Sequence, residues 1–113
     1  SDDIGELVLK DRELLSKSGI VIVSATLDKK TKKLLANPQI LTRGFIYVKD
    51  NLEIVERSEE ISKEVIEEIA NSGGKVDFAK IKQKVRESLG DYFNKETGSI
   101  PMIITVILEI WQF

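Results

Sequence analysis

Acidic side chains are the densest source of chemistry in the sequence, and they gather between residues 53 and 68. Clustered carboxylates can hold hard cations or act as general acids and bases. However, Glu60, Glu64 and Glu68 follow one another at the four-residue spacing that places like charges side by side on a helix. Arg57 and Lys63 are interleaved with them. We therefore interpret the acids as a solvated helix face and not as a metal or acid–base site.

Histidine and cysteine are absent from all 113 residues. Their absence removes the commonest general base, the commonest metal ligand and every thiolate nucleophile. The Ser and Thr hydroxyls therefore lack a histidine that could activate them, and no phosphate-binding glycine loop follows a strand. We predict no catalytic residue, no metal ligand and no cofactor in this chain, and we expect a binding or assembly module rather than a self-contained enzyme.

Lysine side chains form two groups that could contact phosphates. One group occupies a polar turn and comprises Lys29, Lys30, Lys32 and Lys33. The other lies further along the chain and comprises Lys75, Lys80, Lys82, Lys84 and Arg86. Contacts of the turn with RNA phosphates would be sensitive to salt and blind to sequence. The alternative is that these lysines solubilise a loop tip and prevent strand pairing with other chains. The sequence favours the alternative, because no aromatic residue is interleaved with the lysines of the turn.

The strands that would position these groups are predicted from β-branched and apolar runs. Residues 20–27 form a near-continuous apolar run, which is typical of a strand buried on both faces. Residues 38–50 form a second strand, which begins at Pro38 and is interrupted at Arg43 and Gly44. A glycine there indicates a bulge or a close approach of backbone. We expect these two strands to pair as an antiparallel hairpin, and residues 4–9 are a weaker strand candidate.

Two helices are predicted where the apolar period changes from two to about three and a half. The first spans residues 52–71 and is ended by Ser72-Gly73-Gly74. Leu52, Val55, Ser62, Ile66 and Ile69 fall near one stripe, with Ile61 and Val65 beside it. Asp77 caps the second helix, which ends near Gly98. A shorter helix is expected after Asp11. Pro101 opens a last strand, in which alternate residues from Ile104 to Ile110 form a uniformly apolar face.

The order of elements is therefore strand, strand, helix, helix, strand. It predicts an α+β fold of two layers, in which a three-stranded sheet is covered on one face by two helices. Residues 1–18 would lead in from a preceding body, and residues 19–113 would form the domain itself. Composition gives an ordinary globular balance, and the net charge of −2 provides no global attraction to nucleic acid or to an anionic membrane. No apolar run approaches the ~20 residues of a membrane span. The absence of Cys suits a cytoplasmic location.

Three segments together resemble the C-terminal part of ribonuclease J, a metallo-β-lactamase/β-CASP nuclease. The first comprises residues 5–16, GELVLKDRELLS, followed by residues 19–23. The second comprises residues 37–47, NPQILTRGFIY, and is similar to the family's Pro-Asp-Ile-hydroxyl-Arg-Gly-Phe-Val-Tyr. The third comprises residues 101–104 with residues 106–109. No single segment is a catalytic motif, but their order and spacing are specific and cover nearly the whole chain.

The resemblance implies a parent enzyme that degrades and matures RNA, as an endonuclease and as a 5′-to-3′ exonuclease. Zinc or a similar divalent ion would be bound in its β-lactamase domain, and none of those ligands lies in this chain. The implied role of this domain is non-catalytic: self-association or pairing with a paralogous subunit, and support of the catalytic body. Where many members have Thr-Lys-Arg-Arg-Pro-Met-Ile-Leu-Pro, residues 97–105 are TGSIPMIIT. The loss of two positive charges and a proline would mark a less active paralogue.

Four residues are predicted to contact a partner, because aromatic residues and Arg are favoured at interface cores. They are Arg43, Phe45, Trp111 and Phe113. An alternative is that Phe45 and Trp111 close the core of the domain itself, and Arg43 could equally form a salt bridge or pack across a sheet edge. The lysines of the turn are the candidate contacts for RNA phosphates.

Overall fold

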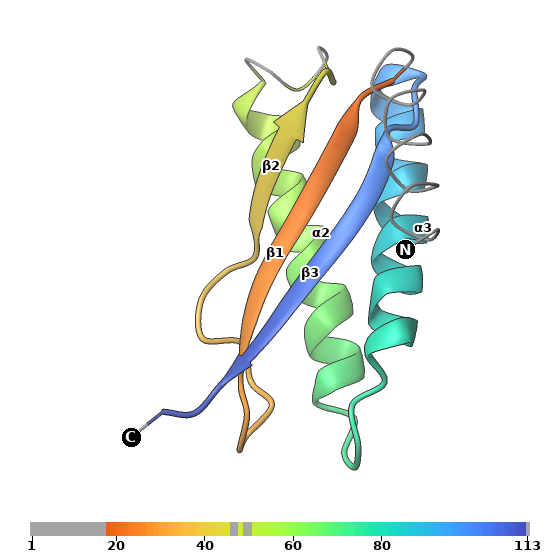
Figure 1. The fold of residues 1–113 in the computed structure, drawn as a ribbon. Coiled ribbons are helices and arrows are strands. Elements are labelled where there is room, and N and C mark those ends of the chain that lie inside the picture. Colours follow the sequence, from red (N-terminus) through yellow and green to blue (C-terminus); the bar gives the residue numbers. More distant parts are fainter. Residues whose placement is uncertain (1–17, 46–47, 49–50, 113) are drawn as a thin grey trace, which may run out of the picture.

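The fold consists of three strands and two helices in the part of the chain that the structure describes. In the computed structural model shown in Figure 1, this part comprises residues 18–45, 48 and 51–112. The elements follow the order β1 (Ile20–Asp28), β2 (Gln39–Arg43), α2 (Leu52–Ala70), α3 (Phe78–Thr97) and β3 (Met102–Ile110). This order confirms the predicted α+β fold. The predicted strand at residues 4–9 and the short helix after Asp11 lie outside the described residues.

β1 lies at the centre of the sheet, whose strand order is β2-β1-β3. It pairs with β2 in antiparallel fashion, with Ile22 opposite Leu41, so the predicted hairpin is confirmed. It pairs with β3 in parallel, with Ile22 opposite Ile104. A parallel pair needs a long crossover connection, and here α2 and α3 both lie within it. The two helices therefore cover one face of the sheet (Figure 1).

The inner face of the sheet, beneath the helices, holds the core. Val21, Val23, Ala25 and Leu27 of β1 are almost completely buried, whereas the alternate residues from Ile22 to Asp28 are only half-buried. The prediction that this strand is buried on both faces is therefore wrong, because the helices cover one face only. Thr105 pairs with Val23 and shares its inward direction. Its Oγ1 is buried and has no hydrogen-bond partner in the described part of the chain.

α2 begins at the Asn51 cap, whose side chain accepts a hydrogen bond from the Ile54 amide at 3.3 Å. Its buried stripe differs from the predicted one. The stripe comprises Ile54, Ser58, Ser62, Val65, Ile66 and Ala70. Leu52, which was placed on the stripe, is 70% exposed. The hydroxyl groups of Ser58 and Ser62 donate hydrogen bonds to backbone carbonyls four residues earlier, at 2.6 and 2.8 Å, and so become compatible with burial.

α3 matches its prediction closely. The Asp77 side chain accepts a hydrogen bond from the Lys80 amide at 3.1 Å, and Gly98 ends the helix in the left-handed conformation. Ile81, Val85, Leu89 and Phe93 are fully buried at the three- and four-residue intervals of one helix face. This face packs on the inner face of the sheet and completes the core.

Gly44 ends β2 and explains why the strand is shorter than predicted. Both Gly44 and Gly19 have positive φ angles, of 70° and 84°. A Cβ atom on Gly19 would lie only 2.4 Å from the Gly44 carbonyl carbon, so the two backbones are in close approach, as the glycine in the strand indicated. Phe45 follows, and its ring packs edge-on against Phe93 at 5.1 Å. Residues 46–47 and 49–50 of the predicted strand lie outside the described residues.

Candidate interaction surfaces

The outer face of the sheet, opposite the helices, is apolar and exposed. Besides the buried Ile20, the register places six aliphatic residues there, which we call the open sheet face: Ile22, Leu41, Ile104, Val106, Leu108 and Ile110. Leu41 is 58% exposed and Leu108 56%. The apolar face predicted for the last strand therefore points away from the core, while the opposite face, with Ile103 and Thr105, points inward. Soluble folds normally bury such a stripe, and an exposed one marks an interaction site.

The predicted partner-contact residues that the structure describes occupy different environments. Arg43 lies exposed at the end of β2, and its guanidinium donates a hydrogen bond to the neighbouring Thr42 carbonyl. Phe45 is 3% exposed and belongs to the core, which is the alternative that the sequence left open for it. Trp111 is 60% exposed just beyond the end of β3 and does not close the core. Phe113 lies outside the described residues.

The lysine turn, residues 29–33, connects β1 to β2 and has a defined conformation. Asp28 Oδ1 accepts hydrogen bonds from the amides of Lys30 and Thr31, at 2.7 and 2.9 Å. These bonds stabilise the ionised carboxyl and lower the pKa of Asp28 below its ordinary value, the bond from Thr31 contributing most. The Asp28 carbonyl also accepts from the Lys32 amide at 2.8 Å. The turn is therefore organised before any ligand arrives.

The four lysines of the turn have two distinct roles. Lys32 has a φ of 63° and its ammonium lies 2.6 Å from Glu109 of β3, so it fastens the turn to the sheet. Both side chains of this ion pair are about a quarter to a third exposed. Lys29, Lys30 and Lys33 are exposed. Of the candidate phosphate contacts, Lys32 is thus already paired, whereas the other three are accessible to a ligand.

An exposed indole lies beside the turn, which the sequence did not reveal. The Lys29 ammonium lies 5.5 Å from the centre of the Trp111 ring, within range of a cation–π interaction. The Lys29 amide donates to the Ile110 carbonyl at 2.8 Å and holds the two segments together. The aromatic residue that the turn itself lacks is Trp111, which directly follows β3. The signal for it in the sequence was the apolar character of residues 110–113, IWQF.

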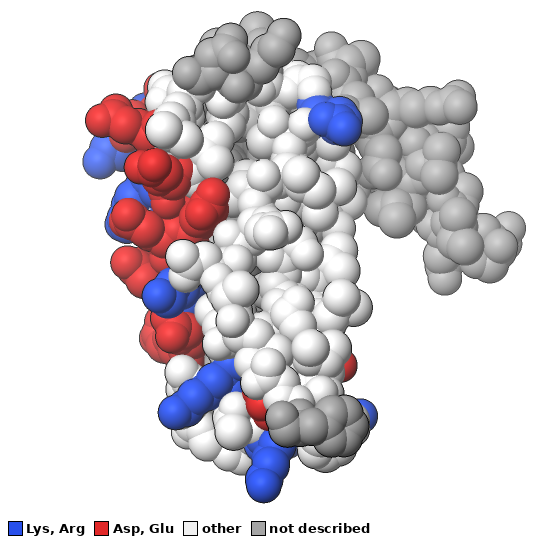
Figure 2. Space-filling model, turned by 90° about the vertical axis from the view of Figure 1, so that its left-hand side faces the viewer, with Lys and Arg blue, Asp and Glu red and all other residues white. Residues whose placement is uncertain are grey.

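The other side of the turn borders a groove. The groove has a volume of about 430 Å³ and lies between Lys30–Lys33 of the turn and the loop that follows α2. The loop contributes Asn71, Gly73 and Gly74, and the last residue of α2, Ala70, also lines the groove. Figure 1 shows the turn, this loop and the end of β3 at the same lower end of the molecule, and Figure 2 shows basic side chains gathered there.

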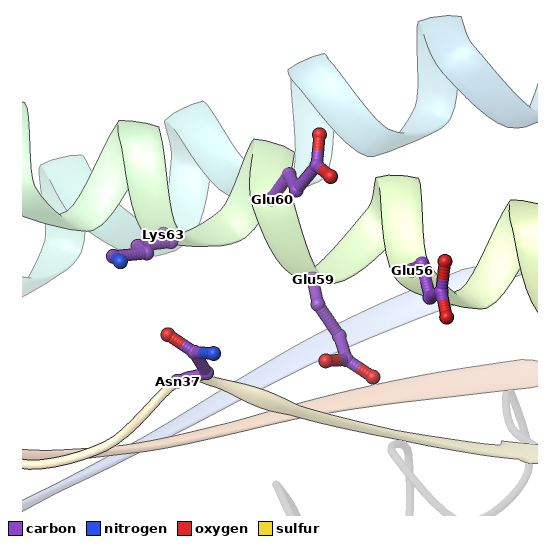
Figure 3. Close-up of a pocket in the computed structure, with 5 residues that line it drawn as sticks. All are labelled: Asn37, Glu56, Glu59, Glu60 and Lys63. Atoms are coloured by element: carbon purple, nitrogen blue, oxygen red, sulfur yellow. The ribbon is translucent and has the colours of Figure 1, made fainter.

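The acidic cluster lies along α2 as predicted, and Figure 2 shows it as a ridge beside the uncharged surface. Arg57 pairs with Glu60 at 3.0 Å and with Glu64 at 3.6 Å. The pKa of Arg57 is raised above its ordinary value, chiefly by the hydrogen bond to Glu60. A shallow pocket of about 260 Å³ lies between this helix and Asn37. In Figure 3, Glu59 extends from α2 towards the sheet, whereas Glu60 points to the opposite side of the helix.

The ridge has no arrangement suited to a metal ion. Among the described residues, no group of three or more Asp, Glu, His or Cys side chains converges to hold one. The described helices also include none that is long and apolar enough to cross a membrane. Two candidate surfaces remain. One is the open sheet face, and the other, which we call the basic end, comprises the lysine turn, the adjoining groove and Trp111.

Comparison with known proteins identifies the family. The model of the ribonuclease J C-terminal domain matches residues 7–110. The chain is 40% identical over 108 residues to ribonuclease J2 of Bacillus subtilis strain 168, and 38% identical to ribonuclease J 2 of Staphylococcus epidermidis. Ribonuclease J 2 of Staphylococcus aureus is 37% identical. Each alignment covers 96% of this chain but only 19% of the relative.

The match agrees with the fold and with the three segments that carried the resemblance. It extends over the strands and helices that form both surfaces, while the chain spans about a fifth of the length of the curated relatives. The chain belongs to the ribonuclease J C-terminal domain family.

Proposed function

We propose that this is the non-catalytic assembly domain of a ribonuclease J-like nuclease, and that the open sheet face docks against a second copy of the domain. The supporting observation is the exposure of three aliphatic side chains in one row of β3. Val106, Leu108 and Ile110 are 43%, 56% and 45% exposed. Removing such a row from water supplies the main favourable term in protein association.

The charge distribution around the face fits a second copy. The polar residues of the face near its centre, Ser24, Thr26 and Gln39, are uncharged, so two copies would bring no like charges together there. Two sheets packed face to face about a two-fold axis at this centre would therefore join aliphatic and uncharged polar side chains.

The chemistry of the parent would lie outside this chain. Relatives named ribonuclease J2 are about five times longer than the aligned segment. We place the cleavage of RNA, including 5′-to-3′ exonuclease and endonuclease activity, in that larger part, with zinc or a similar ion as its metal. The present domain would support it in the cytoplasm by joining identical or paralogous subunits.

The solution mass of the chain, measured by light scattering over a wide concentration range, tests the assembly role. We expect a dimer that dissociates on dilution. Leu108→Glu places a charge in the middle of the open sheet face and should yield a monomer. Leu52→Glu is the matched control, since Leu52 is 70% exposed on α2, away from the sheet face, and should leave the mass unchanged.

Circular dichroism and urea unfolding of both variants separate loss of assembly from loss of fold. A chain that is monomeric at every concentration would contradict pairing of the isolated domain and would leave the catalytic body as the occupant of the face. Equal effects of the two Leu variants would contradict the assignment of the face.

We also propose a second role, contact with RNA phosphates through the lysine turn. The observation that favours it is the exposed Trp111 ring beside Lys29, because single-stranded nucleic acid is bound by cationic side chains together with aromatic platforms.

A further inference from the structure

We propose that the basic end of the domain is a composite site for single-stranded RNA, in which Trp111 stacks on a base and the lysine turn with the adjoining groove holds the backbone. The inference rests on the proposed RNA role and specifies its ligand and its parts. It does not depend on assembly. Segments from both ends and from the middle of the described chain form the site.

The indole determines which form of nucleic acid would bind. Trp111 is 60% exposed, and a large exposed aromatic ring fixed beside a cation presents a π-face on which an unpaired base can stack. Bases in a duplex are already stacked on one another, so a single strand gains this contact and a duplex does not. Inorganic phosphate or polyphosphate would use the lysines alone.

The backbone would follow the turn from the indole to the groove. Lys29 lies on the side of Trp111, whereas Lys30 and Lys33 line the groove of about 430 Å³. The opposite wall includes Gly73 and Gly74, beside which an added Cβ would meet nothing within 4 Å. This wall thus leaves space for a phosphate to approach the backbone, and the exposed Lys75 follows it in the sequence.

The fixed shape of the turn lowers the cost of binding. Asp28 caps the turn, and the Lys32–Glu109 ion pair fastens it to β3. The three exposed lysines are therefore presented from an ordered backbone, although their side chains remain free to adapt. The acidic ridge of α2 would repel the RNA backbone and confine the RNA to the lower end of the molecule (Figure 2).

Binding is tested with the 113-residue chain and a fluorescein-labelled short oligouridylate at low ionic strength, followed by anisotropy. Trp111 is the only tryptophan of the chain, so its intrinsic fluorescence reports directly on this site. We expect saturable binding that quenches this fluorescence. Trp111→Ala should weaken binding about fivefold or more, and Trp111→Phe should retain part of it.

The charges are tested by the double variant Lys30→Ala with Lys33→Ala. We expect affinity to fall about tenfold and the slope of log K against log salt to become shallower by about 1.4, because two phosphate contacts are lost. The control is Lys63→Ala with Lys95→Ala, which removes the same charge from the middle of α2 and the last turn of α3. It should bind nearly as the unaltered chain does.

Four outcomes would overturn the proposal. They are no binding at low salt, equal losses in the two double variants, duplex RNA bound as tightly as the single strand, and inorganic polyphosphate displacing the RNA while Trp111 stays unquenched. The last would show a plain anion-binding surface. Repeating the titration with Leu108→Glu separates this site from assembly, since that variant should bind RNA normally whatever its mass.

Discussion

Gly19 occupies a position where no side chain fits. Its φ is 84°, and a Cβ would lie 2.4 Å from the carbonyl carbon of Gly44 and 2.5 Å from the amide nitrogen of Phe45. Both atoms belong to the backbone, so neither can move aside cheaply. The contact joins the start of β1 to the segment that follows β2 and carries Phe45 into the core.

We predict that Gly19→Ala lowers the free energy of unfolding by more than about 2 kcal/mol, since backbone strain and the clash add together. Gly74→Ala is the control, because Gly74 has a similar φ of 73° but open space around it, and strain alone should cost about 1–2 kcal/mol. Urea unfolding followed by circular dichroism measures both. Equal losses at the two positions would show that the close approach contributes nothing.

Single residues were predictable from the sequence where local chemistry decides their role. Asp77 begins α3 because its side-chain oxygen accepts a hydrogen bond from a free amide of the first turn. Gly98 ends the helix because a glycine adopts the left-handed conformation easily. The proximity of Trp111 to Lys29 was not predictable, since it depends on the parallel register of β1 and β3.

The lysine turn is an element whose stability depends on one carboxylate. Asp28 accepts two amide hydrogen bonds in its ionised form, and its pKa is therefore lowered in the folded state. A lowered pKa means that the carboxylate contributes stability above the ordinary aspartate pKa of about 3.9 and loses it as the pH falls through the folded value. The dependence of stability on pH therefore belongs to the acid range, whereas near neutrality the contribution of Asp28 is fully present and constant.

We predict that the melting temperature of Asp28→Asn depends less steeply on pH below about pH 4 than that of the unaltered chain. The amide oxygen of Asn retains the hydrogen-bonding geometry without titrating. Differential scanning calorimetry between neutral and acid pH compares the two. Parallel profiles over the acid range would show that Asp28 is not responsible for the acid sensitivity of the turn.

Whole elements were predictable where the pattern of apolar residues matched their burial. That condition holds for α3 but only partly for α2, where Leu52 of the predicted stripe is 70% exposed and the polar Ser58, which lay outside it, is fully buried. The Ser58 hydroxyl is satisfied within the helix itself. The strand β3 was predicted correctly. Its apolar face, however, forms the open sheet face, whereas an apolar face of a strand normally faces the core.

The molecule as a whole divides its surface into an acidic ridge, an uncharged sheet face and a basic end (Figure 2). The net charge of −2 conceals this division, since opposite charges cancel in the total but not in space. The strand order β2-β1-β3 creates it by bringing the end of β3 beside the lysine turn. Composition alone could not predict this arrangement.

We predict that salt separates the two proposed functions. Raising the ionic strength from about 50 to 200 mM should weaken oligouridylate binding severalfold, with a slope of about −0.7 per phosphate contacted. It should leave the dimer mass unchanged, because burial of aliphatic side chains is insensitive to screening at these concentrations. Light scattering and anisotropy on the same samples provide the comparison. A dimer that dissociates with added salt would indicate that ion pairs, and not the open sheet face, hold it together.

The parallel pairing of β1 with β3 also governs how the chain can fold during its synthesis. β2 and both helices leave the ribosome before β3 does, so β1 spends that interval with one edge unpaired. Such pairing between distant segments raises contact order and slows folding. An unpaired edge in a nascent chain invites strand pairing with neighbouring chains. Ribosomes that stall before Met102 would release a product lacking its third strand, and chaperones or proteases would have to dispose of it.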